Sequence, residues 1–63
     1  MRGRIKLWLP AKHYGFVEPD DRTRDVFFHD SVVSGAALAV GDAVEYELAK
    51  GTKVLQASRV ARA

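Results

Sequence analysis

The chain has 63 residues and no cysteine, which excludes disulfide bridges and cysteine-based zinc sites as a means of stabilising a small domain. Its net charge of +2 is modest, and no apolar run approaches the roughly 20 residues of a membrane helix. We therefore expect one domain over residues 1–63, cytoplasmic, not membrane-bound, and stabilised by packing alone.

Basic residues are concentrated at the two ends of the chain. Residues 1–17 and 48–63 carry lysines and arginines without any acid, and all eight acidic residues lie between Glu18 and Glu47. If the two ends pair in one sheet, the molecule should have a basic side, which suits a polyanion. The alternative is that these charges merely solvate the surface.

The first half of the chain predicts three strands. Residues 4–9 start with alternating basic and apolar side chains and end at Pro10, which has no N–H to donate to a ladder. Residues 13–18 and 25–29 are β-prone runs separated by residues 19–23, which have the composition of a turn. We expect these two runs to form a hairpin.

The second half predicts two more strands. Residues 30–42 have the composition of a loop with at most one short helical turn. Residues 43–48 place Val44, Tyr46 and Leu48 on one face, and a turn at residues 50–53 leads to a last strand over residues 54–60. Five short strands without sustained helical periodicity predict an all-β, antiparallel small barrel, which also removes exposed sheet edges.

Both faces of the predicted hairpin are apolar. One face carries Tyr14, Phe16, Phe27 and His29, and the other carries Gly15, Val17, Val26 and Phe28. A chain this short cannot cover both faces, so one face must leave aromatic rings at the surface. Valines suit a core, and we therefore expect the face with Phe16 and Phe27 to be exposed.

Exposed rings flanked by Lys6 and Lys12 are suited to single-stranded nucleic acid, because unpaired bases stack on rings while cations meet the phosphates. Stacking accepts any base, so we expect little sequence specificity. The alternatives are core packing for Phe16 and Phe27, a structural role for His29, and plain solvation for the lysines.

Two motifs resemble those of bacterial cold-shock proteins. The segment Lys12-His13-Tyr14-Gly15-Phe16-Val17 is similar to the family's first ribonucleoprotein motif, Lys-Gly-Phe-Gly-Phe-Ile, and Asp25-Val26-Phe27-Phe28-His29 is similar to its second, Val-Phe-Val-His. Their order and spacing also agree. The resemblance implies a five-stranded antiparallel OB-fold barrel and a nucleic-acid site made of Lys6, Trp8, Lys12, Tyr14, Phe16, Asp25, Phe27 and His29.

The resemblance further implies an RNA chaperone or regulator of transcription or translation, with single-stranded RNA and DNA as partners and no cofactor. The sequence leaves monomer and dimer open, and we favour the monomer. With no cysteine and two histidines, the chain shows no nucleophile–base arrangement, so we expect no enzyme and no metal site. The competing interpretation is a small barrel that binds protein through the same aromatic residues.

The chain departs from the family pattern at several positions. Leu7 replaces the usual stacking tryptophan, Trp8 replaces the phenylalanine after it, and Asp30 replaces an aromatic residue, so fewer stacked bases are expected. His13 replaces a glycine, and either adds a contact or simply tolerates the local backbone. Val54 and Leu55 replace Gly-Pro, which could change the last turn.

Overall fold

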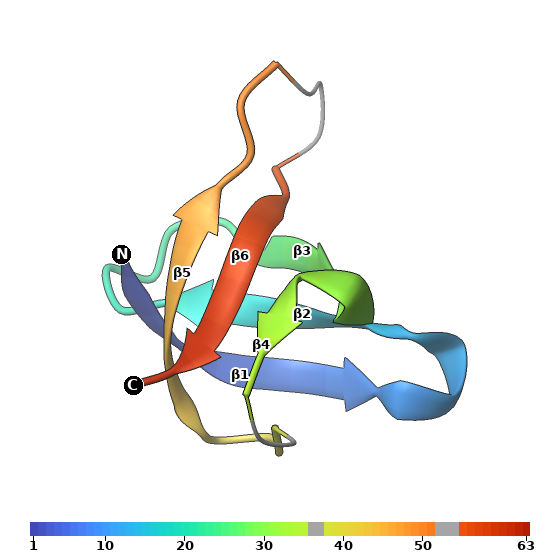
Figure 1. Ribbon diagram of the computed structural model, residues 1–63. Helices are drawn as coiled ribbons and strands as arrows, with labels where there is room; N and C mark the ends of the chain where they lie inside the picture. The colour runs from blue at the N-terminus through green and yellow to red at the C-terminus, as the bar shows by residue number, and fades with distance from the viewer. Residues whose placement is uncertain (36–37, 52–54) are drawn as a thin grey trace.

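The computed structural model describes residues 1–35, 38–51 and 55–63 and contains strands joined by short turns (Figure 1). The elements in chain order are β1 (Arg2–Leu9), η1 (Pro10–Lys12), β2 (Tyr14–Pro19), β3 (Val26–His29), η2 (Asp30–Val32), β4 (Val33–Ser34), β5 (Ala43–Leu48) and β6 (Ala57–Arg62). Both η elements are short 3-10 helices. Within the described ranges, no helix is long and apolar enough to cross a membrane.

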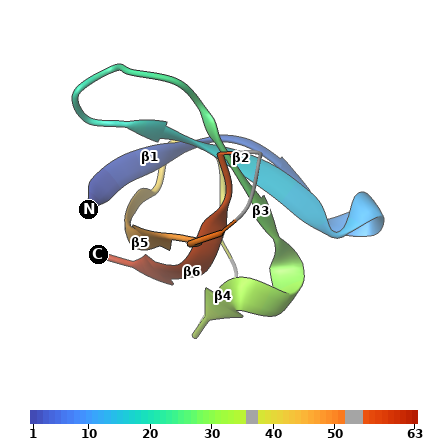
Figure 2. The same ribbon diagram turned by 90° about the horizontal axis from the view of Figure 1, so that it is seen from above.

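The strands form one sheet in the order β3-β2-β1-β5-β6-β4. This sheet curls around a common interior (Figure 2), and its β3 side approaches the segment that leads into β6. There the Phe27 backbone N–H donates to the Leu55 carbonyl over 3.1 Å, and Phe27 forms a single parallel bridge with Gln56. A bridge and not a continuous ladder therefore joins the two sides.

The predicted all-β, OB-type architecture is confirmed, and two details of the prediction are corrected. The sheet has six strands instead of five because the two-residue β4 is added, and β4 pairs parallel to β6. A strand of two residues is too short to show an alternating pattern, so the sequence could not reveal it. The predicted loop over residues 30–42 contains the short helix η2, which agrees with the one short helical turn expected there.

Some predictions fall outside the described residues. These are the second half of the turn at 50–53 and the start of the last strand, at Thr52, Lys53 and Val54, together with Ala36 and Ala37 in the predicted loop. The described part of the last strand begins at Ala57 and continues to Arg62.

The two basic chain ends do not pair with each other. The predicted basic side of the molecule depended on that pairing. The acidic strand β5 lies between β1 and β6. Arg2 Nε contacts Glu45 Oε1 at 3.2 Å, and Arg62 Nη2 contacts Asp42 Oδ2 at 3.0 Å. Positive charge at both ends is thus partly compensated by neighbouring carboxylates.

Among the described residues, nine buried apolar side chains form the core, contributed by every long strand and by the segment before β5. They are Ile5, Val17, Val26, Phe28, Leu38, Val44, Tyr46, Ala57 and Val60. Val17, Val26 and Phe28 are at most 1% exposed, which confirms the inner face predicted for the hairpin. The opposite face of that hairpin is consequently directed away from the core.

Candidate nucleic-acid interface

Three aromatic rings pack together on the outer face of β2 and β3. In the β2–β3 ladder Tyr14 is opposite His29, and Phe16 is opposite Phe27. The ring centroids lie 5.8 Å apart for Tyr14 and Phe27, 5.9 Å for Phe16 and Phe27, and 6.2 Å for Tyr14 and Phe16. Each of the three side chains is half-buried. We call Tyr14, Phe16 and Phe27 the aromatic platform.

An irregularity in β1 decides which of its side chains share the face of the platform. The β1–β2 register shifts between Ile5 and Leu7, and Lys6 and Leu7 are both exposed. Beyond the shift, Leu7 is opposite Phe16 and Leu9 is opposite Tyr14. Because paired residues project to the same side of a sheet, the two leucines lie beside the platform.

Trp8 lies on the other face of the sheet. It is opposite Gly15, packs against the core, and stacks on Phe28 with a centroid distance of 5.5 Å and an interplanar angle of 18°. A Cβ atom at Gly15 would lie 2.5 Å from the Leu7 carbonyl oxygen and 2.8 Å from Phe28 Cζ, so only glycine leaves room for this stack. Trp8 is therefore the one predicted site residue that the structure separates from the rest.

Lys6 and Asp25, both predicted as ligand contacts, contact each other. Lys6 Nζ lies 3.0 Å from Asp25 Oδ2, and this pair spans β2 because Lys6 belongs to β1 and Asp25 immediately precedes β3. The hydrogen bond from Lys6 to Asp25 and the charge of that carboxylate raise the pKa of Lys6. Lys6 thus stays charged at neutral pH, but part of its charge is compensated by Asp25.

Lys12 is the last residue of η1 and is exposed. In the sequence it comes shortly before Tyr14 of the platform. Among the described residues, no carboxylate lies within ion-pair distance of its amine. It is consequently the cation of the predicted site that is most available to a phosphate.

Two histidines and one aspartate meet at the end of the hairpin where β2 begins and β3 ends. His13 Nδ1 lies 2.6 Å from Asp30 Oδ2, and His29 Nδ1 lies 3.2 Å from Asp30 Oδ1. The two imidazole rings are stacked, with centroids 6.3 Å apart. Sequence reasoning predicted His29 as a site residue but missed this cluster, which we call the histidine cluster (His13, His29 and Asp30).

The structure thus brings Tyr14, Phe16, Phe27 and His29 together on the β2–β3 hairpin and pairs Lys6 with Asp25 across β2, while Lys12 lies in η1, just before β2. The sequence missed Leu7 and Leu9 as neighbours of the platform, because a register shift leaves no mark in the pattern of residue types. Across the described ranges, no cluster of three histidine, cysteine or acidic side chains is arranged to hold a metal ion.

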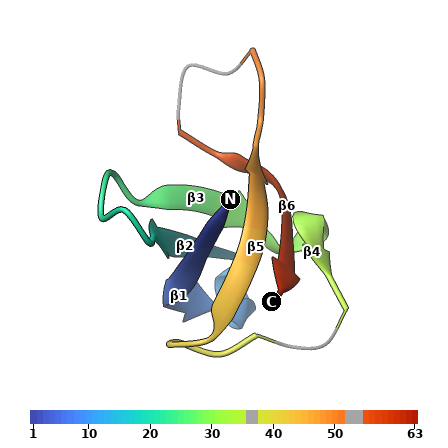
Figure 3. The same ribbon diagram turned by 90° about the vertical axis from the view of Figure 1, so that its left-hand side faces the viewer.

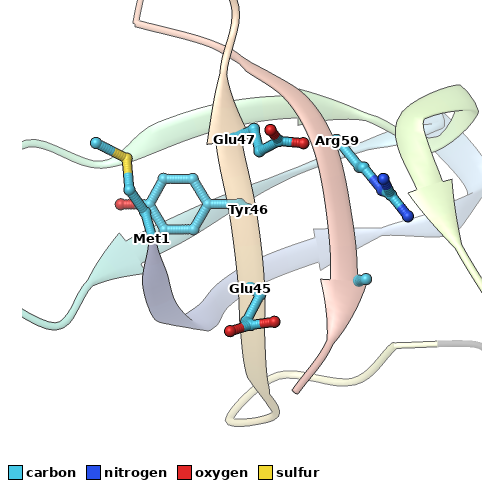
Figure 4. Close-up of a pocket in the computed structure, with 6 residues that line it drawn as sticks. Met1, Glu45, Tyr46, Glu47 and Arg59 are labelled. Atoms are coloured by element: carbon cyan, nitrogen blue, oxygen red, sulfur yellow. The ribbon is translucent and has the colours of Figure 1, made fainter.

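A hollow in the surface lies elsewhere, away from the aromatic platform. It has a volume of about 320 Å³ and is lined by Met1, Glu45, Tyr46, Glu47, Arg59 and Ala61, on β5 and β6 (Figure 4). These strands form the wall of the barrel across from β2 and β3 (Figure 3). Two glutamates at its rim are unfavourable for a polyanion, so the flat aromatic platform is the better candidate site.

Comparison with known proteins assigns the chain to a family. The model of the 'cold-shock' DNA-binding domain matches residues 1–63. The major cold shock protein of Micrococcus luteus is 40% identical, covering 95% of this chain and 94% of that protein. The cold shock-like protein CspE of Escherichia coli K12 is 35% identical, covering 95% and 91%. CspC of the same strain is 38% identical, covering 84% and 81%. The chain therefore belongs to the 'cold-shock' DNA-binding domain family, whose proteins bind nucleic acids and are not enzymes.

Proposed function

We propose that this protein binds single-stranded RNA or DNA on the aromatic platform, with little sequence specificity. The observation that carries the proposal is the contact of Tyr14, Phe16 and Phe27 on an outer face, where each ring remains partly accessible. Three such rings cannot be explained by the core, which lies on the opposite side of the same strands.

The platform suits single strands better than duplexes. Unpaired bases can leave their own stack and lie on protein rings, whereas bases in a duplex are held in pairs and present only their edges. Lys12, which ends η1 just before β2, and Lys6, which pairs with Asp25, are the cations that we expect to meet the phosphates of the bound strand. Because every base has a π-face, this mode of binding reads the strandedness of the nucleic acid more than its sequence.

A protein of this kind would act as an RNA chaperone or as a regulator of transcription or translation. A ligand that binds only the open strand shifts a hairpin equilibrium toward opening by mass action, without ATP or any cofactor. We propose that it does so as a monomer in the cytoplasm, where messages are translated. Binding of a protein partner by the same platform is the competing function, and the experiment below separates the two.

The test is a titration of fluorescently labelled oligonucleotides of equal length, single-stranded and duplex, followed by anisotropy at two salt concentrations. A label on the oligonucleotide is preferable to Trp8 fluorescence because Trp8 packs against the core. We expect the single strand to bind much more tightly than the duplex and its binding to weaken as salt rises, through counterion release. Equal affinity for both forms would indicate that the protein binds nucleic acids only through its positive charge. Absence of binding to either form would favour the protein-partner alternative.

A further inference from the structure

The histidine cluster continues the aromatic platform toward the end of the hairpin. His29 is opposite Tyr14 in the β2–β3 ladder, and the His13 ring stacks beside His29 with an interplanar angle of 29°. The side chains of His13 and His29 are 65% and 51% exposed. Two accessible rings therefore extend the row formed by Phe27 and Tyr14.

The backbone at His13 is less favourable for most residues that have a Cβ atom than it is for glycine. His13 has φ 64° and ψ 28°, in the left-handed region that glycine adopts most readily. Left-handed residues other than glycine persist where the surrounding structure holds them, and they are concentrated at functional sites. A glycine would fit this turn with less strain, so the imidazole is not explained by the needs of the backbone.

Asp30 holds His13 at two points. The Asp30 carboxylate accepts a hydrogen bond from His13 Nδ1 over 2.6 Å, and the Asp30 backbone N–H donates to the His13 carbonyl over 2.9 Å. The Asp30 side chain is only 34% exposed, whereas that of His13 is 65% exposed. The aspartate thus lies beneath an imidazole that faces solvent, as expected for a residue that positions the ring.

The hydrogen bonds also decide which ring nitrogens remain for a ligand. A carboxylate can only accept, so His13 Nδ1 carries a proton and Nε2 is left for a ligand. At His29 the Ser31 backbone N–H donates to Nδ1 over 3.1 Å, so the proton of the neutral ring is on Nε2. Neutral rings therefore offer an acceptor on His13 and a donor on His29, a pair that suits the polar edge of a nucleobase.

We propose that His13, positioned by Asp30, is a nucleic-acid-binding residue that extends the aromatic platform by one nucleotide. This inference rests on the proposed function of the platform. The ligand is a nucleotide of a single strand, whose base lies against the face of the His13 ring, while the in-plane ring nitrogens of His13 and His29 are left for polar atoms of the strand beside that base.

The decisive variant is His13→Gly, which removes the ring at a position where glycine suits the backbone. We expect its melting temperature to equal or exceed that of the wild type, while its affinity for a short oligothymidine falls at least about fivefold, the equivalent of one weakly stacked base. In a series of oligonucleotide lengths, affinity should reach its plateau at a length shorter by one nucleotide.

The matched control is Arg22→Gly, since Arg22 is the other non-glycine residue with positive φ, at 58°, among those described. It lies in the β2–β3 turn, outside the histidine cluster, and its replacement should leave the plateau length unchanged. If His13→Gly proves unstable, His13→Asn keeps a residue that tolerates the left-handed region and still removes the imidazole.

A double-mutant cycle with Asp30→Ala tests the positioning role. The loss of affinity caused by His13→Gly should be smaller in the Asp30→Ala background than in the wild type. Without Asp30 the His13 ring is not held in place, and it therefore contributes less to binding. Equal losses in both backgrounds would contradict a positioning role for Asp30. If the wild type binds single strands but His13→Gly keeps the same affinity and plateau length, the inference is wrong while the proposed function stands. If the wild type itself does not bind, the proposed function is what fails.

Discussion

Two neighbouring phenylalanines on β3 have opposite environments. Phe28 is fully buried and stacks on Trp8, whereas Phe27 is half-buried on the outer face beside Tyr14 and Phe16. Alternation along a strand is the cause, because successive side chains project to opposite faces. The same residue type therefore stabilises the fold at position 28 and is available to a ligand at position 27.

Leu7 offers a residue-level test of the platform, because it is opposite Phe16 and exposed. We expect Leu7→Trp to tighten single-strand binding by up to about 1–3 kcal/mol, the contribution of one more stacked base. The measurement is an oligonucleotide titration of the variant and the wild type. The control is Glu47→Trp, which places the same ring at the hollow on the opposite wall (Figure 4). An equal gain in affinity from both variants would show that an aromatic ring at any exposed position tightens binding, and it would contradict the placement of position 7 beside the bound strand.

The assignment of Phe16, Phe27, Val17 and Phe28 to faces could be predicted from the sequence, because it follows from alternation alone. The position of Trp8 could not, because the register shift after Ile5 reverses the faces of the residues that follow it. Nor could the contact of His13 with Asp30, which depends on a left-handed backbone and on the pairing of two strands. Local patterns do not encode either feature.

At the level of elements, the β2–β3 hairpin presents the proposed site and the remaining strands support it. The hairpin carries the platform on its outer face, while β1, β5 and β6 supply core residues beneath it. The strands of the hairpin could be predicted to within a few residues from alternation and turn chemistry. The β4 strand and the burial of Leu38 could not, because both depend on tertiary contacts of a segment without a periodic pattern.

Asp42 ties the segment before β5 to the end of β6. Its Oδ2 accepts a hydrogen bond from the Ala39 backbone N–H over 2.9 Å and contacts Arg62 Nη2 at 3.0 Å. These two hydrogen bonds hold the pKa of Asp42 below its usual value of 3.8, and the bond from the Ala39 backbone has the larger effect. The ionised form of Asp42 is thus favoured in the folded state.

The lowered pKa predicts a loss of stability in acid. A carboxyl group whose folded pKa is depressed contributes stability above its unfolded pKa, and that contribution disappears as the pH falls through the folded pKa. We expect Asp42→Asn to be less stable than the wild type at pH 7 and the difference to shrink below pH 3.8. Thermal melts at neutral and acidic pH measure it. A difference that stays constant across this range would contradict the role given to the ionised carboxylate.

The whole molecule is a small barrel with two unlike walls. The wall formed by β2 and β3 carries aromatic rings, and the wall formed by β5 and β6 carries the two glutamates that rim the hollow (Figures 3 and 4). The net charge is only +2, and Arg2, Lys6 and Arg62 each contact a carboxylate. We therefore expect long-range attraction to a polyanion to be weak, and most of the affinity of the proposed complex to come from stacking on the platform.

The most direct test of that claim is to compare single-strand binding and thermal stability of the wild type, Phe27→Ala and Phe28→Ala. We expect Phe27→Ala to melt close to the wild type while its affinity falls by about 1–3 kcal/mol, because it loses a stacking surface and no core contact. Phe28→Ala should lose about 3–5 kcal/mol of folding stability, enough to unfold a domain of marginal stability. Wild-type affinity in a folded Phe27→Ala, or unfolding of that variant in place of Phe28→Ala, would contradict the account of the aromatic platform as the binding surface.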